Sequence, residues 1–430
     1  MSKRYQESER FFQKAIKRIP LASQTFSKSI TQYPFGAAPL FMERARGSIT
    51  VDIDGNEYVD LVASLGAITI GYADSGQIRS IKRQLKTGSI FSLPSKLEYQ
   101  VADLLCQVIP SAQKVRFAKN GTDATSGAIR LARAYTGKVH VIACGYHGWQ
   151  DWFVAGTSKN LGVPKVLESL IHNVKFGDMS EVIRVCESLN EDVAAVILEP
   201  INNQYPIGDY LSQLRQFCND KGIILVFDET VTGFRVSTGG AQELIQVMPD
   251  LSCFGKGMAN GFPLAALVGK AEIMDVMKDV FLSGTFGGDN IALVAAKYTI
   301  ERYMKDGIAS ALAEKGQKFR AELGKSLSDN SKEIFSLGGH PSWLFHKWLL
   351  PKEIDQDAVK TLFLQELLKS GVLALSTINV MYALSSGQID RCVNVYAQLL
   401  NDVASNLDND WVTRKLEVEP IRPLFRIRNS

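Results

Sequence analysis

The sequence predicts an α/β fold, in which a large domain built on a mostly parallel sheet is joined to a smaller α+β domain. Between residues 114 and 268, short apolar runs alternate with segments of helical periodicity, which is the pattern of consecutive βαβ units. After about residue 290, helical patterns dominate and strand signals weaken. A chain of 430 residues is long enough for one large and one smaller domain.

Five apolar runs predict the strands of the parallel sheet. Ile223–Phe227 is the clearest, because it is unbroken, rich in branched side chains and bounded by Gly222 and Asp228. Such a run suits a strand that is buried on both faces of a sheet. The other runs are Val115–Ala118, Val139–Cys144, Val193–Leu198 and Leu264–Val268. Helical spacing between them predicts helices over residues 124–135, 179–189 and 211–220.

Residues 1–60 are predicted to form an N-terminal segment that joins the small domain. An amphipathic helical pattern covers residues 3–19 and stops at Pro20. An irregular stretch follows, and then a hairpin whose strands span residues 49–53 and 56–60.

The large domain is predicted to span residues 61–289, and the C-terminal small domain residues 290–410. Ahead of its first strand, the large domain includes a helix over residues 97–108. The small domain has helical patterns at 290–305, 309–327 and 357–370, and weaker strand signals near 334–349 and 372–383. Residues 411–430 are basic and interrupted by proline, which predicts an extended tail.

Composition and charge indicate an ordinary globular protein, with 46% hydrophobic and 22% charged residues. A net charge of +3 over this length gives no reason to expect a nucleic-acid or membrane partner. The longest apolar stretch, residues 61–71, is too short to span a bilayer. The six cysteines are scattered without metal or redox spacing. We therefore expect a cytoplasmic protein with no secretory signal and no metal site.

Lys256 is the candidate nucleophile. It is flanked by Gly255 and Gly257, and no other charged residue lies between Leu251 and Gly269. Loss of water around the ammonium lowers the pKa of a lysine and makes its amine a nucleophile toward carbonyl groups. Schiff-base formation uses such an amine, with pyridoxal phosphate as the usual partner.

Asp228 is the candidate partner of that cofactor. Ligands of open α/β sheets bind at the carboxyl ends of strands, where Asp228 stands. A buried carboxylate there would keep the pyridine nitrogen protonated and the ring electron-withdrawing. The pair also fits a plainer interpretation, a solvent-exposed loop lysine beside a strand-end aspartate.

Three glycine-containing turns offer further binding groups. Lys119–Ala124 opens a helix whose free N–H groups, with the Thr122 hydroxyl, suit a phosphate, although a plain helix N-cap has the same composition. Gly145–Trp149 follows a strand, and an aromatic ring there would either stack on a flat cofactor or only cover the edge of the core. Gly284–Gly288 precedes a helix and is a third candidate anion site.

Taken in order, these motifs resemble the class III aminotransferases, which belong to the fold type I pyridoxal-phosphate enzymes. Within that family the resemblance is closest to glutamate-1-semialdehyde 2,1-aminomutase. It covers roughly residues 15–400, and the matching segments are Asp52–Asp60, Asn120–Ala124, Ala128–Arg133, Gly145–Gly148, Asp228–Arg235 and Pro249–Lys256. The resemblance implies a pyridoxal-phosphate-dependent transferase fold and a homodimer with shared active sites.

The resemblance also implies roles for individual residues. Lys256 would form the Schiff base and shuttle protons, and Asp228 would pair with the pyridinium nitrogen. Gly121 and Thr122 would hold the phosphate. The remaining cofactor contacts would be Tyr146 stacking on the ring, Thr230 against its other face, Asn203 on the ring hydroxyl, and Thr285 on the phosphate in the neighbouring subunit. His147 is expected to be a structural hydrogen-bonding residue.

The substrate-binding segments depart from the family pattern. The arginine that would grip a substrate carboxylate has no counterpart in Thr25–Thr31, and Ile30 falls near its expected position. An expected active-site glutamate corresponds to Asn379. The leading hypothesis is an aminotransferase that takes an amino-acid donor and a carbonyl acceptor, with a sugar-like acceptor suggested by analogy.

Two other functions remain open. One is intramolecular amino transfer of the aminomutase type. The other is a non-catalytic, pyridoxal-phosphate-binding regulatory protein, against which the presence of Lys256, Asp228 and Tyr146 argues.

Overall fold

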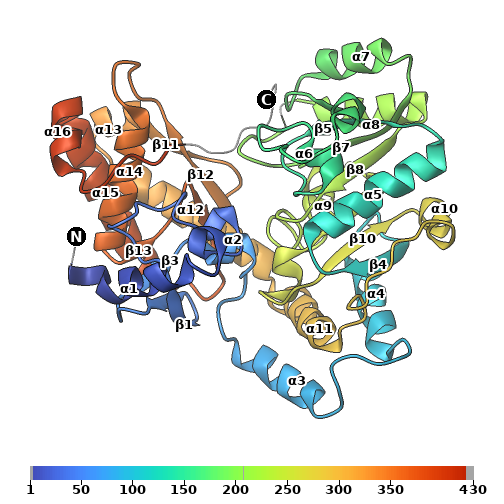
Figure 1. Ribbon diagram of the computed structural model, residues 1–430, viewed down its shortest axis with the longest axis horizontal. Helices are drawn as coiled ribbons and strands as arrows, with labels where there is room; N and C mark the ends of the chain where they lie inside the picture. The colour runs from blue at the N-terminus through green and yellow to red at the C-terminus, as the bar shows by residue number, and fades with distance from the viewer. Residues whose placement is uncertain (1–2, 207, 423–430) are drawn as a thin grey trace. The chain divides into compact units, whose positions relative to one another are not determined.

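The computed structural model describes residues 3–206 and 208–422, which fold as two compact units (Figure 1). Of the described residues, 75–206 and 208–310 form the large unit, and 3–74 together with 311–422 form the terminal unit. The units therefore divide at 74/75 and 310/311, whereas the sequence predicted boundaries at 60/61 and 289/290. Helix α11 (Asn290–Asp306) explains the later C-terminal boundary, because it packs against α3 and α4 of the large unit.

A seven-stranded sheet forms the centre of the large unit. Its strand order is β4-β10-β9-β8-β7-β5-β6, and only β10 runs antiparallel to its neighbours. The five predicted runs are confirmed as β4 (Lys114–Ala118), β5 (His140–Cys144), β7 (Val193–Leu198), β8 (Ile224–Asp228) and β10 (Ala265–Gly269). The sequence missed the short strands β6 (Ile171–Asn173) and β9 (Leu251–Phe254).

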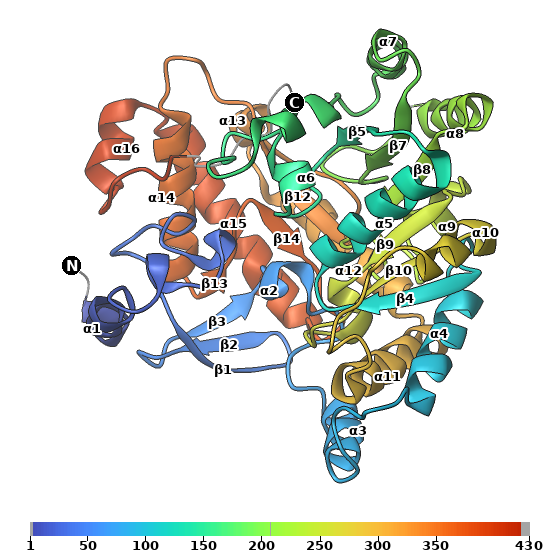
Figure 2. The same ribbon diagram turned by 45° about the vertical axis from the view of Figure 1, so that its right-hand side comes forward.

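Helices cover both faces of this sheet, which explains why its strands are apolar throughout. Helix α5 (Gly121–Thr136) crosses one face, and alternate residues such as Val226 pack with it. Helices α7 (Met179–Ser188) and α8 (Tyr210–Lys221) lie on the other face, where Phe227 joins their core (Figure 2). All three of these helices were predicted from periodicity.

The other helices of the large unit are α3 (Ser75–Leu85), α4 (Lys96–Val108), α6 (Asp151–Val154), α9 (Ala241–Ile245), α10 (Ala271–Met274), η4 (Lys165–Leu170), η5 (Lys256–Ala259) and η6 (Asp275–Lys278). Among them, η5 carries the candidate nucleophile. Helix α12 (Ile308–Ser326) begins in this unit and continues into the terminal unit. Among the residues that the structure describes, no helix combines the length and apolarity needed to cross a membrane.

The terminal unit contains two small sheets. The first has the order β1-β2-β3-β13 and includes the predicted hairpin as β2 (Ile49–Asp52) and β3 (Glu57–Asp60). The second has the order β11-β12-β14. The remaining elements are β1 (Met42–Arg46), β11 (Phe335–Gly338), β12 (Trp343–Trp348), β13 (Val372–Leu373), β14 (Thr377–Asn379), α1 (Gln6–Ala15), α2 (Ala63–Gly66), α13 (Asp329–Ile334), α14 (Gln356–Lys369), α15 (Ser386–Ser405), α16 (Asn409–Lys415), η1 (Lys3–Tyr5), η2 (Pro20–Ala22) and η3 (Phe26–Lys28).

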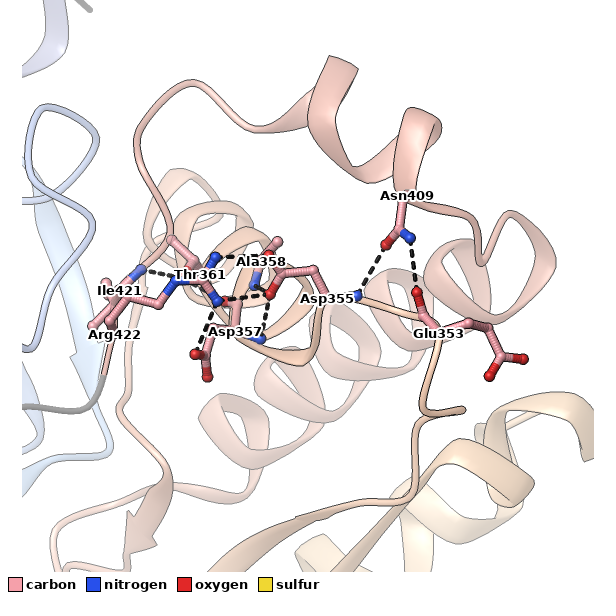
Figure 3. A network of polar contacts seen from close by, with 8 residues as sticks. All are labelled: Glu353, Asp355, Asp357, Ala358, Thr361, Asn409, Ile421 and Arg422. Carbon is pink, nitrogen blue, oxygen red and sulfur yellow. Dashed lines mark hydrogen bonds and ion pairs between the residues drawn. The ribbon is translucent and has the colours of Figure 1, made fainter. Parts of the chain in front are cut away.

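The predicted extended tail is partly helical, because α16 occupies residues 409–415. Figure 3 shows how the segment after α16 is held: both Asp355 and Asp357 pair with Arg422, at 2.8 and 3.0 Å. The Ile421 N–H also donates to the Thr361 hydroxyl. Residues 416–422 are therefore irregular but fixed along α14, and 423–430 lie outside the described residues.

Candidate active site

The candidate residues share one edge of the seven-stranded sheet. Strands β5, β7, β8 and β9 are parallel neighbours, so their carboxyl ends open on the same edge. Strand β4 has the same direction, because β10 is antiparallel to both β4 and β9. The residues that follow these strands are Gly145–Trp149 after β5, Glu199 after β7, Lys256 after β9, and Gly121 at the start of α5 after β4, with Asp228 ending β8.

Lys256 stands at the start of η5 in a left-handed backbone conformation, with φ of 40°. The residue is half-buried, and within the described residues its side chain makes no hydrogen bond or ion pair. Burial lowers the pKa of the Lys256 amine, and the nearby carboxylates of Glu199 and Asp228 only partly offset that effect. The net shift is downward, which increases the fraction of neutral, nucleophilic amine.

Asp228 is buried and forms a pair with the buried His147. The His147 Nδ1 lies 2.9 Å from the Asp228 Oδ2, and its Nε2 lies 3.2 Å from the Cys144 carbonyl oxygen. A carboxylate and a carbonyl oxygen can only accept, so both ring nitrogens of His147 face hydrogen-bond acceptors. Burial raises the pKa of Asp228, but the bonds from His147 and from the Thr230 N–H outweigh it and leave the pKa lowered. The site therefore holds a fixed negative charge.

Glu199 is a site residue to which sequence reasoning gave no role. Its Oε2 accepts a long hydrogen bond from the Tyr146 N–H, at 3.4 Å. Burial and the neighbouring Asp228 raise the pKa of the Glu199 carboxyl to about 7, although His147 and Lys256 act against the shift. The sequence signal that could have identified Glu199 is its position as an acidic residue directly after a fully apolar strand.

We expect Glu199→Gln to stabilise the cofactor-free protein increasingly as pH rises. The pKa of the carboxyl is raised in the fold, so its contribution to stability is fully present below its ordinary pKa of 4.5 and is lost as pH rises through about 7. The variant's advantage in unfolding free energy should grow by up to roughly 3 kcal/mol across that window. Urea unfolding of wild type and variant, below the ordinary pKa of 4.5 and above about pH 7, measures this difference in unfolding free energy. The substitution of an exposed residue, Glu187→Gln, is the control. Parallel pH dependences in wild type and Glu199→Gln would contradict the assignment.

Glycines let the turns at the sheet edge approach closely. A Cβ on Gly148 would lie 2.3 Å from the Thr122 Oγ1, and one on Gly121 would lie 2.8 Å from the Thr230 Cγ2. The Thr122 hydroxyl accepts from the Trp149 N–H at 3.2 Å. The N–H groups of Gly121 and Thr122 open α5 and have no acceptor among the described residues, so they are available to an anion.

Tyr146 offers an aromatic ring at the same edge. Its side chain is half exposed and packs edge-to-face on Phe153 at 5.6 Å. Burial of its hydroxyl and the charge of Asp228 raise the pKa of Tyr146, which places the phenol within the electrostatic reach of that carboxylate. Because the residue is 50% exposed, part of it remains accessible to a flat ligand.

Asn203 and Thr285 are exposed. Among the described residues, no hydrogen bond or ion pair connects either side chain to the other site residues. Asn203 lies in the loop that follows β7, where the Gln204 N–H donates to the Asn202 side chain. Thr285 lies in the exposed turn that precedes α11. The described residues contain no group of three or more His, Cys, Asp or Glu side chains that could hold a metal ion.

Comparison with known proteins identifies the family. Residues 33–398 match the family model described as Aminotransferase class-III. The chain belongs to the class III aminotransferases. This aminotransferase is 40% identical over 307 residues to 3-aminobutyryl-CoA aminotransferase from Cloacimonas acidaminovorans, covering 70% of the chain and 73% of the relative. It is 38% identical over 317 residues to glutamate-1-semialdehyde 2,1-aminomutase from Salinibacter ruber, covering 70% and 72%.

Solved structures agree with the fold of this aminotransferase. An omega-transaminase from Sphaerobacter thermophilus matches with a TM-score of 0.83 and 26% identity, covering 93% of this chain and 98% of that one. A glutamate-1-semialdehyde-aminomutase from Pseudomonas aeruginosa PAO1 matches in fold with a TM-score of 0.82 and 20% identity, covering 94% and 95%. The predicted fold type I architecture is therefore confirmed.

Pyridoxal phosphate is the cofactor of this aminotransferase, and the residues at the sheet edge fit it. Free N–H groups at the start of α5 suit the phosphate, and the glycines leave room where a Cβ would collide. Asp228 offers a fixed carboxylate, and Lys256 offers an amine of lowered pKa. The reaction of the protein is pyridoxal-phosphate-dependent amino transfer.

Proposed function

We propose that the protein moves an amino group from an amino-acid donor to a separate carbonyl acceptor, with Lys256 as the covalent attachment point and proton carrier. The observation that carries the proposal is the half-buried Lys256, which has no ion pair within the described residues and lies within electrostatic reach of the carboxyl groups of Glu199 and Asp228. When bound, pyridoxal phosphate supplies an electron-withdrawing ring that stabilises negative charge at the substrate carbon.

The residues around Lys256 hold and orient the reactants in this proposal. Lys256 would hold the cofactor through its Nζ, and the amine freed when a substrate amine takes its place would carry the proton at the reacting carbon. Asp228 would hold the proton on the ring nitrogen, and the contact with His147 keeps the Asp228 carboxylate ionised and oriented. Gly121 and Thr122 bind the phosphate through their N–H groups.

The other cofactor contacts follow the family pattern. Tyr146 would cover one face of the ring and Thr230 the other, from the turn that packs against Gly121. Asn203 would reach the ring hydroxyl from the loop after β7. Thr285 would reach the phosphate in the partner subunit.

Borohydride trapping tests the proposal. Reduction of the purified, cofactor-loaded protein followed by peptide mapping should place the cofactor on Lys256 alone. The ion-paired Lys270 and Lys119 serve as internal controls in the same unit. A cofactor adduct on another lysine would refute the proposed role, as would the absence of any adduct from a protein that binds the cofactor.

A second candidate is intramolecular amino transfer, favoured by the many relatives named glutamate-1-semialdehyde 2,1-aminomutase. The two activities differ in their need for a second substrate. An aminotransferase treated with donor alone stops in the aminated cofactor form, whereas an aminomutase continues to turn over. A screen of donors with keto-sugar, keto-acid and acyl-thioester acceptors identifies the substrates, the last class included because of the relative named for 3-aminobutyryl-CoA.

We expect glutamate 1-semialdehyde to be a poor substrate. Ile30 and Lys28 both line a cavity of about 510 Å³ in the terminal unit, and the Lys28 Nζ lies 3.3 Å from the Ser64 hydroxyl. A lysine offers a carboxylate a point charge, without the planar two-bond fork of arginine. Loss of a charge-assisted contact costs about 1.5–3 kcal/mol, or roughly ten- to a few-hundredfold in affinity.

Steady-state assays with the semialdehyde measure this expectation. Lys28→Arg should lower its KM, and Lys28→Met serves as the uncharged control. Efficient conversion of the semialdehyde by the wild-type protein would show that the lysine is a sufficient partner.

We also expect a homodimer with shared sites. Thr285 and the neighbouring Phe286 are exposed in the turn before α11, and Phe91 and Leu93 are exposed in a segment tied to α11 by the Asn290 N–H bond to the Ser89 carbonyl. Mixed Lys256→Ala and Thr285→Ala subunits should then regain part of the activity that each variant lacks, because some sites receive both residues. A fully active monomer in sedimentation experiments would rule out shared sites.

A further inference from the structure

The turn that carries Lys256 is closed by a pair of buried amides, Gln77 and Asn260. Gln77 lies near the start of α3, Asn260 directly follows η5, and each side chain belongs to a residue only 3% exposed. The Asn260 Nδ2 donates to the Gln77 Oε1 at 3.3 Å, and the Gln77 Nε2 donates to the Ala259 carbonyl at 3.1 Å. Both contacts tie the end of the lysine turn to α3.

Helix α11 fixes the orientation of the Gln77 amide. The Gln77 Nε2 lies 3.1 Å from the Thr299 hydroxyl and 3.4 Å from the Ala295 carbonyl. Carbonyl oxygens can only accept, so the NH₂ group must face them and the Oε1 must face Asn260. Gly76 allows this approach, because a Cβ there would lie 2.1 Å from the Tyr298 hydroxyl on α11.

The backbone of the lysine turn needs such support. Lys256 and Asn260 both have left-handed conformations, with φ of 40° and 45°. Residues other than glycine keep this conformation only where surrounding contacts hold it, although asparagine tolerates it better than most. Gln77 provides those contacts at the end of the turn, through one side chain and one carbonyl.

We propose that Gln77 is a positioning residue for Lys256, acting through Asn260 and the Ala259 carbonyl. The charged groups near the lysine are Glu199, Asp228 and Arg235. In a loosened turn, the ammonium gains access to solvent or to a direct pair with either carboxylate, and both changes favour the charged form. Gln77 thereby keeps the amine nucleophilic. This inference rests on the proposed role of Lys256.

Gln77→Leu in the full-length protein tests the inference. In the cofactor-free form, labelling of Lys256 with trinitrobenzenesulfonate is followed against pH by peptide mapping. The midpoint should move up by roughly one unit, so that labelling near neutral pH falls about tenfold. In the loaded enzyme, kcat should fall roughly ten- to a hundredfold with little change in KM.

Asn260→Gly and Gln365→Leu are the companion variants. Asn260→Gly keeps the left-handed backbone but removes the amide, so it should shift the midpoint in the same direction and add little to Gln77→Leu. Gln365 is fully buried in the terminal unit, and its amide bonds the Lys415 carbonyl and the Glu417 N–H. Its replacement should lower stability and leave Lys256 labelling unchanged.

Wild-type labelling midpoints and kcat in folded Gln77→Leu and Asn260→Gly would overturn the inference, as would equal shifts in Gln365→Leu. If Gln77→Leu does not fold, the labelling midpoint and kcat of Asn260→Gly alone test the inference. Borohydride trapping in the wild-type protein distinguishes failure of this inference from failure of the proposed function. If only this inference fails, the cofactor is still trapped on Lys256; if the proposed function fails, it is not.

Discussion

Lys256→Ala should abolish turnover while leaving a folded protein that still binds the cofactor. Loss of a positioned acid–base group alone typically removes about 10²–10⁴ in rate, and Lys256 also provides the covalent attachment in the proposed function. We therefore expect a fall of at least roughly 10³–10⁴ in kcat. Binding should persist because the N–H groups at the start of α5 and the Asp228 carboxylate are unaffected.

Stability gives an independent check on the same variant. The Lys256 ammonium has no ion pair within the described residues, and burial lowers its pKa, so the charged form is disfavoured in the fold. Removing it should leave cofactor-free protein at least as stable as wild type at neutral pH in urea unfolding. The control Lys270→Ala breaks a 2.6 Å pair with Asp250 and should reduce stability but retain activity. Substantial turnover by Lys256→Ala would refute the role of the lysine.

The sequence predicted the central sheet well because its strands are buried on both faces. An unbroken apolar run such as Val193–Leu198 needs no knowledge of its neighbours to be read as a strand. Strand β9 was not predicted because it is only four residues long and Ser252 interrupts its apolar run, whereas its position between β8 and β10 becomes visible only in the sheet. Helix α3 was not predicted for a similar reason. Its buried side includes Gly76 and Gln77, where large apolar residues would have shown the helical periodicity.

The candidate site was only partly predictable. Lys256 and Asp228 stand out individually, one as an isolated cation and the other as a charge that ends an apolar strand. The partnership of Asp228 with His147, and the raised pKa of Glu199, depend on β5, β7 and β8 being neighbours in space. Strand order is a property of the fold, so those roles became visible only in the structure.

Asp228→Asn should leave the cofactor bound but reduce turnover by roughly 10²–10³, which is typical for loss of one preorganised electrostatic contact. Asparagine has nearly the same shape and can still accept from His147, whose Nδ1 lies 2.9 Å away. It lacks the charge that holds a proton on the ring nitrogen, so negative charge at the substrate carbon is less well stabilised.

The pH dependence of this loss follows from the pKa of Asp228. That pKa is lowered below its ordinary value of 3.8, so the wild-type carboxylate is ionised throughout the neutral range and is neutralised only in strong acid. The ratio of wild-type to Asp228→Asn activity should therefore stay constant across neutral pH.

Asp250→Asn is the matched control, because Asp250 is also a buried carboxylate of the large unit but pairs with Arg215 and Lys270. It leaves two cations without their partner, so it should destabilise the protein more than Asp228→Asn and affect the turnover of folded enzyme less. Steady-state kinetics combined with urea unfolding separates the two effects. Near wild-type turnover in folded Asp228→Asn would show that the ring nitrogen needs no charged partner, and would transfer the electrostatic role to another group at the sheet edge.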